Sequence, residues 1–148
     1  LTTLDAVSPQ RRLVELKRFA EHLGLALNPQ PRYFPVDATP SARLITAVAQ
    51  QDGMAAAMAL AGAVLAACWR EERNIASDAT LAELLEECDL PAERLAESRG
   101  ADTQARYDAH TQAALDAGVF GAPTYVIDGE LFWGPDRLDF VARKLGIA

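Results

Sequence analysis

Histidine and cysteine, the usual metal ligands and nucleophiles, are rare in this sequence of 148 residues, with two of each. The two cysteines, Cys68 and Cys88, form no Cys-x-x-Cys pair, and each continues an apolar stripe at helical spacing. We interpret both as buried thiols of helix cores, since free cysteine is among the most buried residue types; a structural disulfide is the alternative. His22 and His110 stand alone, without the spacing of metal ligands, so no metal site is predicted.

The stretch of residues 118–139 combines two prolines, three aspartates and strong hairpin signals. Residues 124–127 are apolar, β-branched and aromatic, which is typical of a buried strand. Asp128 and Gly129 then predict a two-residue hairpin turn, with the returning strand after it. Pro123 stands at the entry of the first strand, where a proline is either trans at a sheet edge or cis for a functional purpose.

Gly134 and Pro135 predict the start of the last helix, because proline suits a first helical position. Asp136 follows in the first turn. The ordinary role of such a carboxylate is to complement the positive end of the helix dipole and to accept hydrogen bonds from free N–H groups. A carboxylate at this position can also bind the cationic group of a ligand.

Helices must position this stretch, since they dominate the rest of the chain. Apolar residues recur at helical spacing in several segments before the hairpin, and an isolated hairpin needs further structure to be stable. We predict a mostly helical part with an N-terminal connecting segment over residues 1–100, then a helix, a β-hairpin and a last helix over residues 101–148, together in one compact unit. The first predicted helix starts at Pro9, with Ser8 as its N-cap, and is closed by Gly24. The following helices are predicted over residues 41–51, 54–73, 80–88, 91–100 and 101–117, and the last helix contains Leu138 and Leu145.

Residues 118–139 read G-V-F-G-A-P-T-Y-V-I-D-G-E-L-F-W-G-P-D-R-L-D, and this pattern resembles the C-terminal end of a thioredoxin-fold group. That group contains 2-hydroxychromene-2-carboxylate isomerase, the kappa-class glutathione transferases and the DsbA-like disulfide oxidoreductases. The ending F-W-G-x-D-R favours the isomerase and kappa branch. The resemblance implies an α/β protein with a thioredoxin-like fold and an all-helical insertion.

The resemblance also implies glutathione as the cofactor and four residues that bind it. In the isomerase and kappa branch the proline that matches Pro123 is cis. The backbone at Ala122, just before it, would pair with the cysteinyl part of glutathione as a β-strand would. Asp136 would bind the γ-glutamyl ammonium group, and Pro135 stands where the family has serine. The ordinary structural roles of these residues remain the alternative.

The family's nucleophile has no counterpart in this sequence. It lies in the first helix of an N-terminal strand–helix–strand unit, as serine in the isomerase and kappa branch and as cysteine of a Cys-x-x-Cys pair in the oxidoreductases. A helix N-terminus favours the ionised form of such a group. That unit is lacking in the given sequence, which begins with Leu1 rather than Met. We therefore expect a processed, truncated or partial chain, and the catalytic residue stays unknown.

On this resemblance we expect a glutathione-dependent isomerase, or a kappa-type glutathione transferase, that acts on an aromatic-derived small molecule and forms a homodimer. Two alternatives stay open. One is a DsbA-like thiol-disulfide oxidoreductase, which a cysteine upstream of Leu1 would support. The other is a non-catalytic binding protein that keeps the same fold.

Composition argues against other classes of function. The sequence has 14 Lys and Arg against 21 Asp and Glu, and a net charge of −7 lacks the basic footprint of nucleic-acid binding. The apolar run at residues 60–69 is too short to span a membrane, and no signal peptide is recognisable. We expect no nucleic-acid partner, no membrane partner and a cytoplasmic location.

Overall fold

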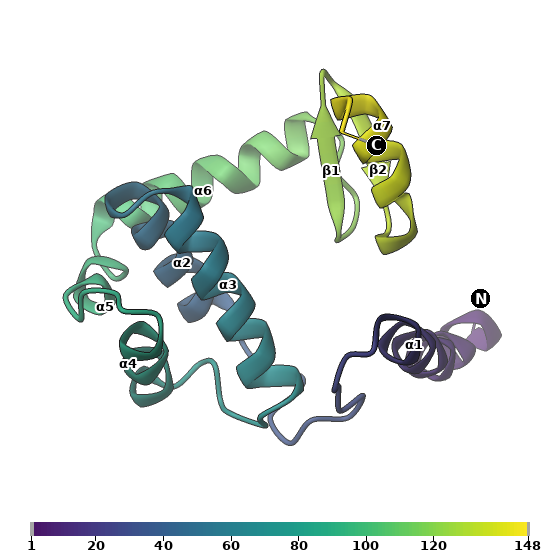
Figure 1. Ribbon diagram of the computed structural model, residues 1–148, viewed down its shortest axis with the longest axis horizontal. Helices are drawn as coiled ribbons and strands as arrows, with labels where there is room; N and C mark the ends of the chain where they lie inside the picture. The colour runs from purple at the N-terminus through teal and green to yellow at the C-terminus, as the bar shows by residue number, and fades with distance from the viewer. Residues whose placement is uncertain (1, 148) are drawn as a thin grey trace. The chain divides into compact units, whose positions relative to one another are not determined.

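A computed structural model describes the backbone of residues 2–147 and the side chains of residues 10–147 (Figure 1). None of the helices in this part of the chain is both long and apolar enough to cross a membrane. The elements are, in order, α1 (Thr2–Leu23), α2 (Thr39–Gln51), α3 (Met54–Trp69), α4 (Asp78–Glu87), α5 (Arg94–Glu97), α6 (Ala101–Asp116), β1 (Thr124–Ile127), β2 (Glu130–Trp133), the 3-10 helix η1 (Pro135–Arg137) and α7 (Leu138–Leu145).

The chain forms two compact units, which we call the helical unit and the C-terminal unit. The helical unit ends at Gln104 and the C-terminal unit starts at Ala105, so the division falls within α6. The expected boundary after residue 100 and the expected packing of both parts as one unit stay predictions.

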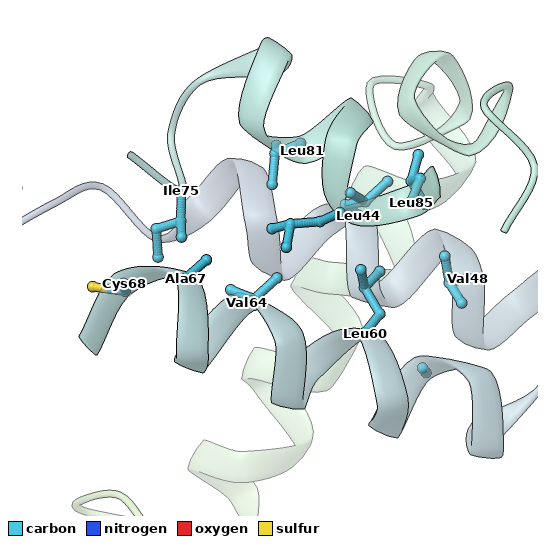
Figure 2. Close-up of a cluster of buried hydrophobic side chains, with 11 residues drawn as sticks. Leu44, Val48, Leu60, Val64, Ala67, Cys68, Ile75, Leu81 and Leu85 are labelled. Atoms are coloured by element: carbon cyan, nitrogen blue, oxygen red, sulfur yellow. The ribbon is translucent and has the colours of Figure 1, made fainter. Parts of the chain in front are cut away.

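The helical unit closes around a core rich in leucine. α2 and α3 lie side by side, and α4 packs against α3 (Figure 1). Figure 2 shows Leu44 of α2 between Leu81 and Leu85 of α4 and Leu60 of α3. Burial of one such side chain stabilises the fold by about 1.5–3 kcal/mol, so this cluster dominates the stability of the unit. Its largest fully buried side chains, each at most 1% exposed, are Leu44, Val48, Leu60, Leu81, Leu84 and Leu85.

The turn between α2 and α3 is fixed by a glycine and an arginine. Asp52 N–H donates to Val48 O at 2.8 Å and ends α2, and Gly53 then adopts a φ of 92°, a backbone conformation that favours glycine. Arg94 donates from Nε and Nη2 to both carboxylate oxygens of Asp52, at 2.7 and 3.0 Å. These hydrogen bonds lower the pKa of Asp52. The start of α5 is thereby tied to the α2–α3 turn.

The single helix predicted over residues 91–100 is wrong, because this segment is a series of turns around the short α5. The N–H groups of Arg94 and Leu95 bond to the carbonyl groups of Pro91 and Ala92, three residues back. This is the tighter 3-10 pattern, which is common in short connecting pieces. The predicted start of the first helix at Pro9 is also wrong, because α1 begins at Thr2 and includes Ser8 and Pro9. The remaining predicted helices agree with the structure to within a few residues at each end.

The C-terminal unit contains the hairpin and α7, which packs against β1. β1 and β2 are antiparallel, with Thr124 opposite Trp133. Asp128 and Gly129 both have positive φ, 51° and 79°, as a two-residue type I′ turn requires, so the predicted hairpin is confirmed. In residues 105–147 no apolar side chain is fully buried. This unit therefore does not close a core of its own within the described chain.

Candidate functional site

The four residues predicted to bind a ligand flank the open end of the hairpin, opposite its two-residue turn. Ala122 and Pro123 come directly before β1, and Pro135 and Asp136 follow β2 after Gly134. Gly134 N–H donates to Pro123 O at 2.9 Å, one step beyond the last pair of the strand ladder. This hydrogen bond holds the two segments next to each other. All four predicted residues are exposed.

The backbone of Ala122 is open to a ligand. Ala122 is exposed, and neither its N–H nor its C=O forms a hydrogen bond with any residue in the described part of the chain. The Ala122–Pro123 peptide bond is cis, as the resemblance implied. Thr124 Oγ1 donates to Gly121 O and fixes the backbone just before Ala122. An exposed donor and acceptor beside a strand are the groups that an extended peptide uses to add a further strand.

A pair of exposed aromatic rings lies beside this backbone. The rings of Phe120 and Trp133 are 5.2 Å apart between centroids at an angle of 54°, and the two residues are 71% and 53% exposed. A Cβ on Gly121 would lie 2.8 Å from Trp133 Nε1, so the absence of a side chain there lets the indole approach. Sequence reasoning missed Phe120, because nothing in its spacing indicates that a turn brings it onto Trp133.

Asp136 lies in η1, in the turn that leads into α7. Its Oδ2 accepts a hydrogen bond from Arg137 Nη1 at 2.7 Å. A Cβ on Gly134 would lie 2.6 Å from Asp136 Oδ1, and Gly134 has a φ of 114°, so the carboxylate folds back over a residue that must be glycine. The position in the first turn also suits the ordinary helix-dipole role. Arg137 as the partner of this carboxylate was not foreseen from the sequence.

The cysteines belong to the helical unit and are core residues there. Cys68 is buried and Cys88 is half-buried, and both are free thiols, so the alternative of a structural disulfide is wrong. Burial raises the pKa of both thiols, and the charges of Glu87 and Asp89 raise that of Cys88 further. A nucleophilic thiol needs a lowered pKa, so neither thiol has the chemistry of a catalytic cysteine. Among the described side chains, no three His, Cys, Asp or Glu residues converge in a way that could hold a metal ion.

Comparison with known proteins identifies the family to which the chain belongs. A family model described as a DSBA-like thioredoxin domain matches residues 6–146. The 2-hydroxychromene-2-carboxylate isomerase of Pseudomonas putida is 32% identical over 136 residues, which are 90% of this chain and 63% of that protein. The protein of the same name from Pseudomonas sp. (strain C18) is 33% identical over 137 residues, again 90% of this chain, and 60% of its own length is covered.

A solved structure gives the same picture. The structure of SeMet 2-hydroxychromene-2-carboxylate isomerase superposes with a TM-score of 0.74 at 26% sequence identity. The superposition covers 98% of this chain and 66% of that one. The chain thus spans about three fifths to two thirds of the length of the relatives that it matches.

Proposed function

This chain belongs to the family of DSBA-like thioredoxin domains. We propose that it functions as a glutathione-dependent isomerase of the 2-hydroxychromene-2-carboxylate type. Membership in the family and the match to the solved isomerase confirm the predicted α/β, thioredoxin-like fold. The names of the curated relatives support the isomerase reaction for the whole protein. Glutathione dependence and an aromatic-derived substrate are our proposal for this chain.

The observation that carries the proposal is the free backbone of Ala122. Its exposed N–H and C=O have no partner in residues 2–147, and Ala122 comes directly before Pro123, the residue that precedes β1. The cysteinyl residue of glutathione has one N–H and one C=O of its own, so two reciprocal hydrogen bonds would orient it as an added strand. The small side chain of Ala122 leaves the approach to this backbone open.

The second contact is electrostatic. Asp136 would bind the γ-glutamyl ammonium group, for which its Oδ1 is the oxygen not held by Arg137. Pro135 has neither a hydroxyl nor an N–H, so it would contribute shape rather than a hydrogen bond. The hydrogen bond from Gly134 N–H to Pro123 O joins the segment of Asp136 to the segment of Ala122.

The chemistry that follows is a reversible addition. Bound glutathione supplies a thiolate whose addition to a double bond permits rotation and whose departure restores that bond, so no net oxidation occurs. The residues of this chain orient the tripeptide, and the exposed rings of Phe120 and Trp133 offer an apolar surface to an aromatic substrate. The serine that the resemblance implies as the group that holds the thiolate is not identified in the given sequence.

The test is an isomerisation assay with 2-hydroxychromene-2-carboxylate, with and without glutathione, together with calorimetric titration of glutathione. Asp136→Asn should weaken glutathione binding by about tenfold, the effect of losing one hydrogen-bonded charge pair. Asp128→Asn removes the same charge at the other end of the hairpin, where positive φ suits asparagine, and should bind as the unaltered chain does. Equal losses in both variants would contradict the assignment of Asp136.

Outcomes of the assay also separate the remaining alternatives. Binding of glutathione without isomerisation would favour the non-catalytic binding protein or the kappa-type transferase. An electrophilic substrate distinguishes these two, because only the transferase would conjugate it to glutathione. A DsbA-like oxidoreductase needs an activated cysteine, and the raised pKa values of Cys68 and Cys88 disfavour both as that residue. A cytoplasmic location, which suits two free thiols, and a homodimer remain part of the proposal.

A further inference from the structure

A cavity of about 210 Å³ lies in the helical unit, where the N-terminal ends of α2 and α4 meet the segment that follows α5. It includes none of the residues of the hairpin site. Three stretches far apart in the sequence line it, within residues 37–43, 78–81 and 95–99. Part of its wall is apolar, formed by Pro40, Leu81 and Leu95, and the rest carries charged groups.

One of these charged groups, Arg43, has an unusual environment. Three arginines among residues 10–147 are half-buried, namely Arg43, Arg73 and Arg94. Arg73 and Arg94 each bind two or more carboxylates. Arg43 has no carboxylate partner in that range: its Nη2 donates to Gly100 O at a long 3.4 Å, and its buried Nε has no partner. Half-buried charges are normally paired, so Arg43 retains most of its capacity to bind an anion.

The two acidic side chains of the cavity do not neutralise Arg43, because both are engaged elsewhere. Asp78 forms an ion pair with Arg99. Asp37 Oδ1 accepts a hydrogen bond from Thr39 N–H at 2.9 Å, and this bond lowers the pKa of the Asp37 carboxyl group. The Asp37 carboxylate is therefore ionised at neutral pH.

We propose that this cavity is a binding site for a small monocarboxylate with an apolar body, held by the Arg43 guanidinium and by the wall of Pro40, Leu81 and Leu95. A guanidinium presents parallel N–H donors that match the two oxygens of a carboxylate. Sites for drug-sized molecules occupy roughly 300–1,000 Å³. A cavity of about 210 Å³ therefore fits a single-ring molecule, not a nucleotide.

The charges around the cavity narrow the class of ligand further. The ion pair of Asp78 with Arg99 adds no net charge to the cavity, but the charge of Asp37, unpaired within residues 10–147, lines it together with Arg43. A ligand with two negative charges would therefore be repelled by Asp37 more strongly than a ligand with one. A single carboxylate avoids most of this cost. A short anion such as acetate would leave most of the apolar wall without a contact, whereas a monocarboxylate with a single ring contacts both the guanidinium and the apolar wall.

The proposal is tested by titrating the ¹⁵N-labelled full chain with benzoate, benzamide and acetate. Benzoate should cause saturable shifts confined to the backbone of residues 37–43, 78–81 and 95–100. Benzamide has the ring without the charge and should bind about tenfold more weakly, and acetate has the charge without the ring and should also bind more weakly. Equal affinity for benzoate and benzamide would overturn the proposal. So would a titration in which benzoate shifts only resonances that lie outside these three segments.

Variants make the assignment to Arg43 specific. Arg43→Met keeps an apolar stem and should reduce benzoate affinity about tenfold, whereas Arg70→Met, at an exposed arginine outside the cavity, should leave it unchanged. Asp37→Asn keeps an oxygen that can accept from Thr39 N–H but removes a negative charge, so it should bind benzoate more tightly. Because this variant gains affinity, it tests the site even where Arg43→Met folds poorly. No gain in Asp37→Asn, or an unchanged affinity in folded Arg43→Met, would overturn the assignment.

Discussion

The helical unit closes a core of fully buried leucines, whereas the C-terminal unit has no fully buried apolar side chain among residues 105–147. Leu60 of α3 and Leu84 of α4 are at most 1% exposed, but Trp133 is 53%, Leu138 51% and Phe140 52% exposed. Both units are built from ordinary amphipathic elements, so the difference lies in whether these elements find partners. The helical unit supplies the stability of the described chain. The C-terminal unit carries the open backbone and exposed rings that we assign to ligand binding.

The first prediction tests where the stability lies. Leu60→Ala creates a cavity in the closed core and should cost about 2–5 kcal/mol of unfolding free energy. Leu138→Ala, the same change at a half-exposed position of the C-terminal unit, should cost well under half as much. Urea unfolding followed by circular dichroism measures both. Similar losses would mean that the C-terminal unit has a core after all.

The second prediction concerns the backbone that joins the two segments of the hairpin site. Gly134→Ala places a Cβ 2.6 Å from Asp136 Oδ1 at a φ of 114°. Strain of about 1–3 kcal/mol should loosen the open end of the hairpin. Hydrogen exchange should become faster at residues 124–133, with the amides of the helical unit unchanged. Gly129→Ala, at the turn, also has positive φ but meets no atom within 4 Å, so it should weaken the turn and leave the Asp136 end in place.

A third prediction uses pH to examine the ion pair that closes the helical unit. Hydrogen bonds from Arg94 hold the pKa of Asp52 below its usual value near 4 in the folded state. The stabilisation is therefore complete above about pH 4 and is lost as the pH falls through the lower, folded pKa. Asp52→Asn should be less stable at neutral pH and should lose less stability on acidification. If Asp52→Asn unfolds in acid with the same pH dependence as the unaltered chain, this ion pair does not contribute to the stability of the helical unit.

The prediction with the smallest expected effect compares the solvent exposure of the two tryptophans, one in each unit. Trp69 is half-buried and packs on Phe34 with ring centroids 4.6 Å apart, whereas Trp133 is 53% exposed. The variant Trp69→Phe retains Trp133, and Trp133→Phe retains Trp69. Acrylamide should quench the fluorescence of the first variant more strongly than that of the second. Equal quenching would show that the rings of the hairpin site are covered in solution.

The sequence alone predicts the local features well. Asp128 and Gly129 specify the hairpin because a type I′ turn needs positive φ at both positions. The proximity of Ala122 to Asp136 then follows from strand pairing, although their roles came from the family resemblance. Glycine spacing and apolar periodicity also indicated most helix positions.

Other features depend on geometry that no local pattern encodes. The contact of Phe120 with Trp133 requires the turn at Gly121, and the pairing of Asp136 with Arg137 depends on side-chain direction in a 3-10 helix. The cavity at Arg43 combines three segments that are distant in the sequence. Such tertiary arrangements arise only when the core has closed.

The most direct test of the account is the amide resonance of Ala122 during titration of the ¹⁵N-labelled chain with glutathione. If glutathione adds as a strand, the Ala122 N–H should acquire an acceptor and shift downfield in a saturable way. The amides of residues 124, 133, 134, 136 and 137 should shift with it. S-methylglutathione, which keeps the same backbone, should produce the same shift. Saturation of the protein without a change at Ala122, or no binding of glutathione, would contradict the assignment of the hairpin site.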